Sequence, residues 1–137
     1  MNSSCTIDAS VIVSAFSPAE AAHPASKAFL TRVRDEAAPM ILPTLVLPEL
    51  ASAIARGQGK PDLGIAFAEE LSHFPNLVLV DLDESLAKLA VEVAAQYRLR
   101  GSDAVYAAVA LRFGTRLVTL DREQLDRLEG VLPVGAP

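Results

Sequence analysis

The stretch TIDASVIVSAF, residues 6–16, decides the fold of this 137-residue chain. The apolar run Cys5–Ile7 has the pattern of a buried strand, and the segment after it has the spacing of a short helix with Ser10 as its predicted cap. Between the two lies Asp8, which is followed by the apolar residues 11–13. A carboxylate among buried residues needs a partner, so Asp8 is the first candidate for a functional residue.

Apolar, strand-like runs alternate with helix-like segments along the rest of the chain. The expected strands are residues 39–44, 76–82, 115–121 and 131–134, and the expected helices are residues 18–37, 44–57, 62–74, 83–99, 101–114 and 122–130. Pro24 is expected to break or kink its helix, Pro48 to lie in a first turn, and Gly57 to end a helix. The continuous apolar run 77–80 predicts a strand covered on both faces. This alternation predicts a parallel β-sheet sandwiched by helices, a three-layer α/β/α fold forming a single domain over residues 1–137.

The composition narrows the class of protein. With 51% hydrophobic and 21% charged residues, the chain is typical of a globular domain and not of a disordered one. A lone cysteine, Cys5, cannot form an internal disulfide, and neither a signal-peptide pattern nor a membrane-spanning run is apparent. We therefore expect a cytoplasmic protein without a membrane contact. The formal net charge of −5 means that any nucleic-acid site must rely on locally gathered basic residues.

Four acidic residues in four separate segments are the strongest functional signal. Ligand sites of parallel sheets lie outside the carboxyl ends of the strands, and acids follow or rim such ends: Asp8, Glu49, Asp103 and Asp121. Each also has a structural explanation. Asp103 and Asp121 could favour helix N-termini, whereas Asp8 and Glu49 lie among apolar residues and could be held by a buried partner.

Convergence of the four acids would favour a bound cation. Without one, the carboxylates would repel one another and some would take up protons. A site with only oxygen ligands suits Mg²⁺ or Mn²⁺ and not zinc. Such an ion can promote attack of water on a phosphodiester. Whether one or two ions would bind is left open by the sequence.

The motifs around these acids resemble those of the PIN domain family. The matching stretches are TIDASV with Asp8, LPEL with Glu49, GSDAVYAAVA with Asp103 and LVTLD with Asp121. Within the family, the chain is similar to the VapC-type toxins of prokaryotic toxin–antitoxin pairs, and the resemblance covers nearly the whole chain. Many relatives have a further acid and a phenylalanine shortly after the fourth aspartate, where this chain has Glu123 and Leu125.

This resemblance implies an endoribonuclease that depends on Mg²⁺ or Mn²⁺ and is built on a PIN-like sheet. The four acids would hold the metal, and Ser10 and Thr119 would support them. Members of the family are commonly homodimers that are inhibited by a small VapB-like antitoxin, whose C-terminal segment covers the active site. The expected partners are therefore an RNA substrate, a cognate antitoxin and a second copy of the chain.

Basic residues near the acids are candidates for binding RNA phosphates. The candidates are Arg98, Arg100, Arg116 and Arg122. Ordinary solvent exposure or ion pairing is the alternative for each of them. Tyr106 has the position of a core residue, although a tyrosine can also stack on a base.

Two other functions compete with catalysis. A PIN-like scaffold could bind RNA or a protein without cleaving it, although this chain keeps all four acids. A phosphorylation-controlled receiver domain would need paired acids after the first strand and a lysine after the last one. The sequence offers only Asp8 at the first position and no lysine beyond Lys88, so this class is excluded.

Overall fold

A computed structural model describes residues 3–137 of the chain. In this part the strands are β1 (Cys5–Ile7), β2 (Met40–Pro43), β3 (Leu77–Val80), β4 (Arg116–Val118) and β5 (Val134–Gly135). The helices are α1 (Ala9–Phe16), α2 (His23–Asp35), α3 (Val46–Gln58), α4 (Pro61–Ser72), α5 (Glu84–Tyr97), α6 (Gly101–Phe113) and α7 (Arg122–Arg127).

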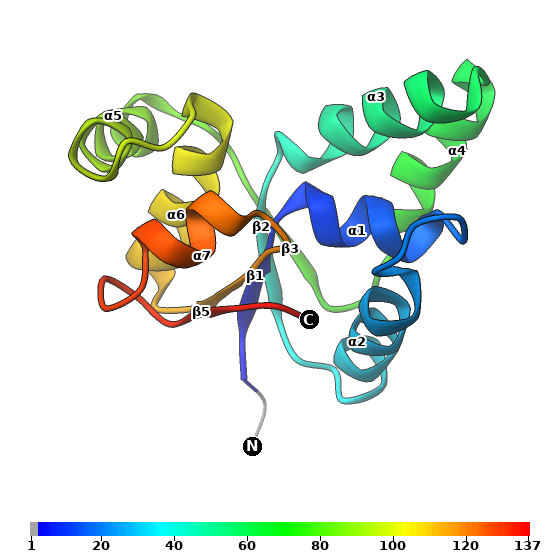
Figure 1. Cartoon of the computed structure of the whole chain (residues 1–137), viewed down its shortest axis with the longest axis horizontal. Coiled ribbons are helices and arrows are strands. Elements are labelled where there is room, and N and C mark those ends of the chain that lie inside the picture. Colours follow the sequence, from blue (N-terminus) through cyan, green and yellow to red (C-terminus); the bar gives the residue numbers. More distant parts are fainter. Residues whose placement is uncertain (1–2) are drawn as a thin grey trace.

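The five strands form one parallel sheet in the order β3-β2-β1-β4-β5. Helices α1 to α4 lie on one side of the sheet, and α5, α6 and α7 lie on the other (Figure 1). The predicted three-layer α/β/α architecture is thus confirmed. Within the described residues, no helix is both long and apolar enough to cross a membrane.

The position of β1 in the sheet determines where a site can form. This strand is buried along its whole length and pairs with β2 on one side and β4 on the other. After β1 the chain adds β2 and β3 on one side of this strand, and it then returns to add β4 and β5 on the other side. The strand order reverses between β1 and β4, and the crevice at such a switch point is where open parallel sheets bind ligands.

Helix α6 provides the apolar backing for this crevice. Eight consecutive residues, from Asp103 to Ala110, are buried, because the helix packs against three strands, β1, β2 and β4. Alanines make up half of this run and allow close approach to the sheet. Gly114, with φ of 65°, ends the helix in the left-handed conformation that glycine adopts without steric cost.

The ends of three predicted helices need adjustment. Pro24 does not kink a long helix but lies in the first turn of α2, where its missing N–H is not needed. Helix α3 passes through Gly57 and ends at Gly59, whose φ of 66° makes it the better stop. Ser10 is not the cap of α1, because Asp8 takes the N-cap position.

Strand β3 is not covered on both faces, so that prediction was wrong. It is an edge strand, and Val78 is 48% exposed. An apolar run predicts burial but does not say whether the strand is central or at an edge. Helices α3 and α4 approach each other closely at Gly64. Any side chain at this position would collide with the carbonyl oxygen of Ala51.

Candidate functional site

The carboxyl ends of β1 and β4 open into a cleft of about 390 Å³. Its lining comes from the starts of α1 and α6, from α3 and from the segment after β4: Asp8, Ala9, Ser10, Glu49, Arg100, Ser102, Asp103, Leu120 and Asp121. The structure thus brings all four predicted acids to one cleft, although they are separated by up to 113 positions in the chain. The fold achieves this by placing two strand ends side by side.

Asp8 is the most rigidly held of the four acids. It is 6% exposed, and three side chains donate hydrogen bonds to its Oδ2 atom: Ser10 at 2.7 Å, Thr119 at 3.0 Å and Gln124 at 3.4 Å. No donor among residues 3–137 reaches Oδ1. One oxygen therefore fixes the carboxylate, and the other is left for a ligand in the cleft.

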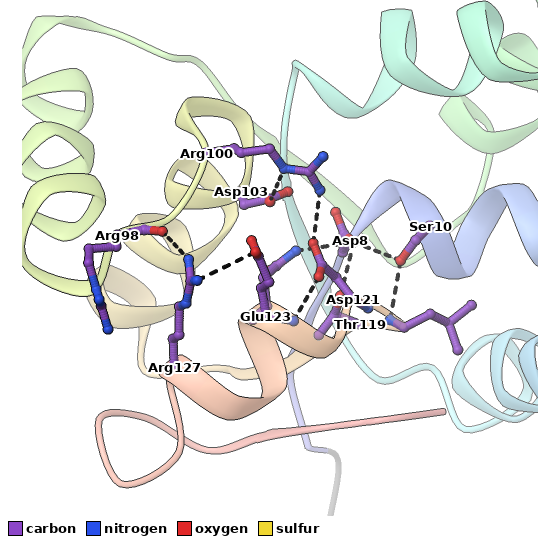
Figure 2. Close-up of polar contacts among 11 residues, drawn as sticks. Asp8, Ser10, Arg98, Arg100, Asp103, Thr119, Asp121, Glu123 and Arg127 are labelled. Carbon is purple, nitrogen blue, oxygen red and sulfur yellow. Dashed lines mark hydrogen bonds and ion pairs between the residues drawn. The ribbon is translucent and has the colours of Figure 1, made fainter.

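The two hydroxyl groups also connect β1 to the segment after β4 (Figure 2). Ser10 Oγ accepts a hydrogen bond from the backbone N–H of Leu120 at 3.2 Å, and Thr119 Oγ1 accepts one from the N–H of Asp121 at 3.0 Å. Each hydroxyl donates to Asp8 and accepts from the chain near Asp121. Ser10 and Thr119 therefore fix the relative positions of two acids from distant parts of the sequence.

Glu49 depends on a partner that sequence reasoning placed only in the core. The hydroxyl of Tyr106, a fully buried residue of α6, donates a 2.6 Å hydrogen bond to Glu49 Oε1. Burial raises the pKa of Glu49, and the charge of Asp8 raises it further. The bond from Tyr106 and the charge of Arg100 partly oppose this rise. Glu49 is thus a partly buried acid with one oxygen fixed by α6.

Asp103 carries the largest electrostatic cost of the four acids. Burial, and secondly the charge of Asp8, raises its pKa from 3.8 to about 6, although contacts with Arg100 act in the opposite direction. The first turn of α6 holds Asp103 in the cleft. A carboxylate in this environment is stabilised by any additional positive charge.

Asp121 has both oxygens engaged. Its Oδ1 atom caps α7 by accepting the backbone N–H of Glu123 at 2.9 Å, and its Oδ2 atom accepts Arg100 Nη2 at 3.0 Å. Burial by itself raises the pKa of Asp121. These two bonds, together with the nearby amide of Gln124 and the charge of Arg100, outweigh burial, so the pKa of Asp121 lies below its usual value.

The other predicted residues are only partly brought to the cleft. Arg98 and Arg122 are exposed on nearby segments but do not line it. Arg116 begins β4 and pairs with Cys5 at the opposite end of the sheet, about 10 Å of extended chain before Thr119. Its expected place beside the acids is therefore wrong.

The roles of two residues of α7, Glu123 and Gln124, could not be assigned from the sequence. Glu123, whose role the motif comparison left open, forms an ion pair with Arg127 at 3.4 Å and does not line the cleft. Gln124 is fully buried and contacts Asp8. Its Oε1 atom has no hydrogen-bond partner in the described part of the chain. The pattern REQLDR gives no signal for this burial, which follows from α7 packing over the end of β1.

The cleft suits a divalent cation by its chemistry. All four acids offer oxygen ligands, the type that Mg²⁺ and Mn²⁺ prefer. Four carboxylates face one guanidinium, that of Arg100, so the lining has excess negative charge. Within residues 3–137, however, no three acids are grouped closely enough to form a ready-made metal cluster. The residues fit such an ion provided that their side chains move closer together.

A family model and solved structures identify the fold. The model of the PIN domain matches residues 5–131. Mycobacterium tuberculosis VapC20, described as a sarcin-ricin loop cleaving toxin, is 17% identical, with a TM-score of 0.76 over 97% of this chain and 99% of that one. For DNA-bound VapBC from Salmonella typhimurium the identity is 16% and the TM-score 0.71, over 99% and 98% of the two chains.

A third similar structure is FitAcB from Neisseria gonorrhoeae, at 18% identity and a TM-score of 0.68 over 95% of each chain. No curated protein sequence matches the chain significantly. At these identities the solved structures establish the fold alone. The family model, in contrast, spans the chain from β1 to beyond α7, and so the chain belongs to the PIN domain family.

Proposed function

We propose that this protein is an endoribonuclease that depends on Mg²⁺ or Mn²⁺ and acts as the toxin of a VapBC-type toxin–antitoxin pair. The observation that carries the proposal is the meeting of four carboxylates from four segments in one cleft at the switch point of a PIN domain. Purely structural acids would have no reason to share a cleft, because each raises the cost of charging the others.

Asp8, Glu49, Asp103 and Asp121 would hold the cation. When bound, it would polarise a phosphoryl oxygen and make a nearby water more acidic. The free Oδ1 atom of Asp8 is the best-prepared ligand, since the hydrogen bonds at Oδ2 fix its direction. Asp103 gains most from the added charge, because its pKa is raised to about 6.

Other groups of the chain would prepare the reaction. Ser10 and Thr119 keep Asp8 oriented. Tyr106 fixes the Oε1 atom of Glu49, which leaves the second oxygen of this acid for the cation. RNA phosphates would meet positive charge from Arg100 at the cleft and from Arg98 and Arg122 nearby.

A groove on the α1–α4 side of the sheet, lined by apolar and charged side chains, is the proposed binding site of the antitoxin. It has a volume of about 410 Å³ between α1, α2 and α4, and its wall includes Phe16 stacked on Phe67 at 4.9 Å. The solved structures described as VapBC or FitAB complexes support a partner of this kind. Apolar side chains exposed on α5 and α6, such as Val91 and Phe113, would lie in a homodimer interface.

The test is a calorimetric titration with Mn²⁺ of the wild type, Asp8→Asn and Asp103→Asn, joined to cleavage assays on a mixed RNA pool. Asp35→Asn, at the end of α2 and outside the cleft, is the control for loss of one negative charge. We expect binding and metal-dependent cleavage in the wild type and in the control. Both should be lost in the two cleft variants, which should still unfold cooperatively on heating.

Full cleavage activity in Asp8→Asn would contradict the proposal. So would RNA binding that is saturable but indifferent to Mn²⁺ and to both substitutions, because the protein would then be a PIN-like binding module without catalysis.

A further inference from the structure

Arg100 joins two of the proposed metal ligands. It lies at the N-cap position of α6, and its Nε atom donates to Asp103 Oδ2 at 3.1 Å while Nη2 donates to Asp121 Oδ2 at 3.0 Å. Figure 2 shows dashed lines from the guanidinium to both carboxylates. A single positive side chain thus bridges acids that come from α6 and from the segment after β4.

The bridge occupies oxygens that a cation would need. One oxygen of Asp121 already caps α7, so the oxygen bound to Arg100 is the one that remains for a metal. The same holds in part for Asp103, whose Oδ2 atom accepts Arg100 Nε. A divalent ion that approached these two oxygens would therefore compete with the guanidinium for their lone pairs and would repel its positive charge.

Arg100 is also free to leave. Its side chain is 73% exposed, whereas those of Asp103 and Asp121 are only 10% and 18% exposed. Exposed ion pairs are weak because water and salt screen them. The guanidinium can therefore return to solvent at small cost, while the two acids stay in the cleft.

We propose that Arg100 is an intramolecular competitor of the divalent cation, holding Asp103 and Asp121 in the metal-free protein and leaving them when the ion binds. This inference rests on the proposed metal-dependent function. Within residues 3–137 no three acids are grouped as a metal cluster, and the positive charge that Asp103 and Asp121 now share is that of Arg100. Arg100 is then free to contact an RNA phosphate only after the ion is bound.

Calorimetric Mn²⁺ titrations of the wild type, Arg100→Gln, Arg100→Lys and Arg56→Gln test the competition. Arg56 lines the neighbouring groove on α3 with Glu49 but forms no ion pair within residues 3–137, so its substitution controls for charge alone. We expect about three- to tenfold tighter binding in Arg100→Gln, the range that loss of screened ion pairs allows.

Arg100→Lys keeps the charge but lacks the fork that bridges two carboxylates, and we expect it to bind Mn²⁺ more tightly than the wild type does. Arg56→Gln should change the affinity less than Arg100→Gln. A second measurement follows the Nε–H signal of Arg100 by NMR during a Mg²⁺ titration of the wild type. It should shift or disappear with the midpoint of the binding curve.

Unchanged or weaker Mn²⁺ binding in Arg100→Gln would overturn the competition while leaving the metal site in place. An Nε–H signal unaffected by saturating Mg²⁺ would do the same. If neither the wild type nor Arg100→Gln bound Mn²⁺, the proposed function itself would fail together with this inference.

Discussion

The hydroxyl of Tyr106 donates a 2.6 Å hydrogen bond to Glu49 Oε1, across 57 positions of the sequence. Tyr106 is fully buried in α6 and Glu49 lies on α3, so this bond ties the acid to the helix behind the sheet. Core packing and the geometry of the cleft are therefore linked at this residue.

Replacing Tyr106 by phenylalanine removes the bond and keeps the ring. Because that bond lowers the pKa of Glu49, we expect the pKa to rise further and the acid limb of the pH–activity profile to move to higher pH. The loss in stability should be about 1 kcal/mol, the usual net value of a hydrogen bond. Tyr97→Phe, on the partly buried surface of α5, is the matched control. An unchanged pH profile in Tyr106→Phe would show that the bond does not act on Glu49.

Asp103 should make the folded protein less stable as the pH rises. Its pKa is about 6 in the folded protein against an ordinary value of 3.8, first because of burial and second because of Asp8. The folded state therefore holds this proton more strongly than the unfolded state. Its contribution to stability is present below pH 3.8 and is lost as the pH rises through about 6.

Asp103→Asn lacks this titration and should not lose stability in this way. Between acidic and neutral pH, the free energy of unfolding of the variant minus that of the wild type should therefore rise by about 1–3 kcal/mol. Denaturant unfolding of both proteins across this range measures the difference. The wild-type affinity for Mn²⁺ should rise over the same range, because a proton on Asp103 competes with the ion. Parallel stability curves for the two proteins would contradict the predicted pKa of Asp103.

The stability of the protein should depend strongly on the charge of residue 124 and weakly on whether its side chain is polar. Its amide donates to Asp8 at 3.4 Å, while its Oε1 atom is buried without a partner in the described chain. Gln124→Met removes both the donor and the unsatisfied acceptor, so we expect a stability change within about 1 kcal/mol. Gln124→Glu adds a buried charge beside Asp8 and should cost about 3 kcal/mol at neutral pH. Equal stability of the two variants, measured by denaturant unfolding, would show that Gln124 does not face Asp8.

The sequence was informative wherever burial follows a local pattern. Apolar runs and helical spacing were enough to predict the order of the strands and helices, because each element buries its own stripe of side chains. The four acids could be grouped from the same information, since parallel strands end at a common edge. Gly57 was a plausible helix end for the same reason, yet Gly59 ends α3, because both glycines fit and only one has a positive φ.

Relationships that depend on packing between distant segments could not be predicted. Tyr106 and Glu49 meet because α3 and α6 approach the same sheet end from opposite sides, and Gln124 is buried because α7 covers the end of β1. The prediction that Arg116 lies beside the acids was wrong for a simpler reason. Arg116 is near Asp121 in sequence, but an extended strand advances about 3.3 Å per residue and carries the two residues apart.

Asp121 has two separable roles, and amide and alanine substitutions distinguish them. Its Oδ1 atom caps α7 and its Oδ2 atom faces the cleft. Asparagine caps helices as well as aspartate does, so Asp121→Asn should keep the stability of the wild type and lose Mn²⁺ binding. Asp121→Ala should lose both, with about 1 kcal/mol of stability lost through the cap.

Asp83 gives the matched control, because it caps α5 by accepting the N–H of Leu86 at 2.8 Å and does not line the cleft. Asp83→Ala should lose a similar amount of stability while binding Mn²⁺ as the wild type does. Thermal unfolding and metal titration of the wild type and these three variants are sufficient for the comparison. If Asp121→Asn bound Mn²⁺ with wild-type affinity, Asp121 would be a helix cap alone. The metal would then have to rely on Asp8, Glu49 and Asp103, and the oxygen that Arg100 holds on Asp121 would not be contested.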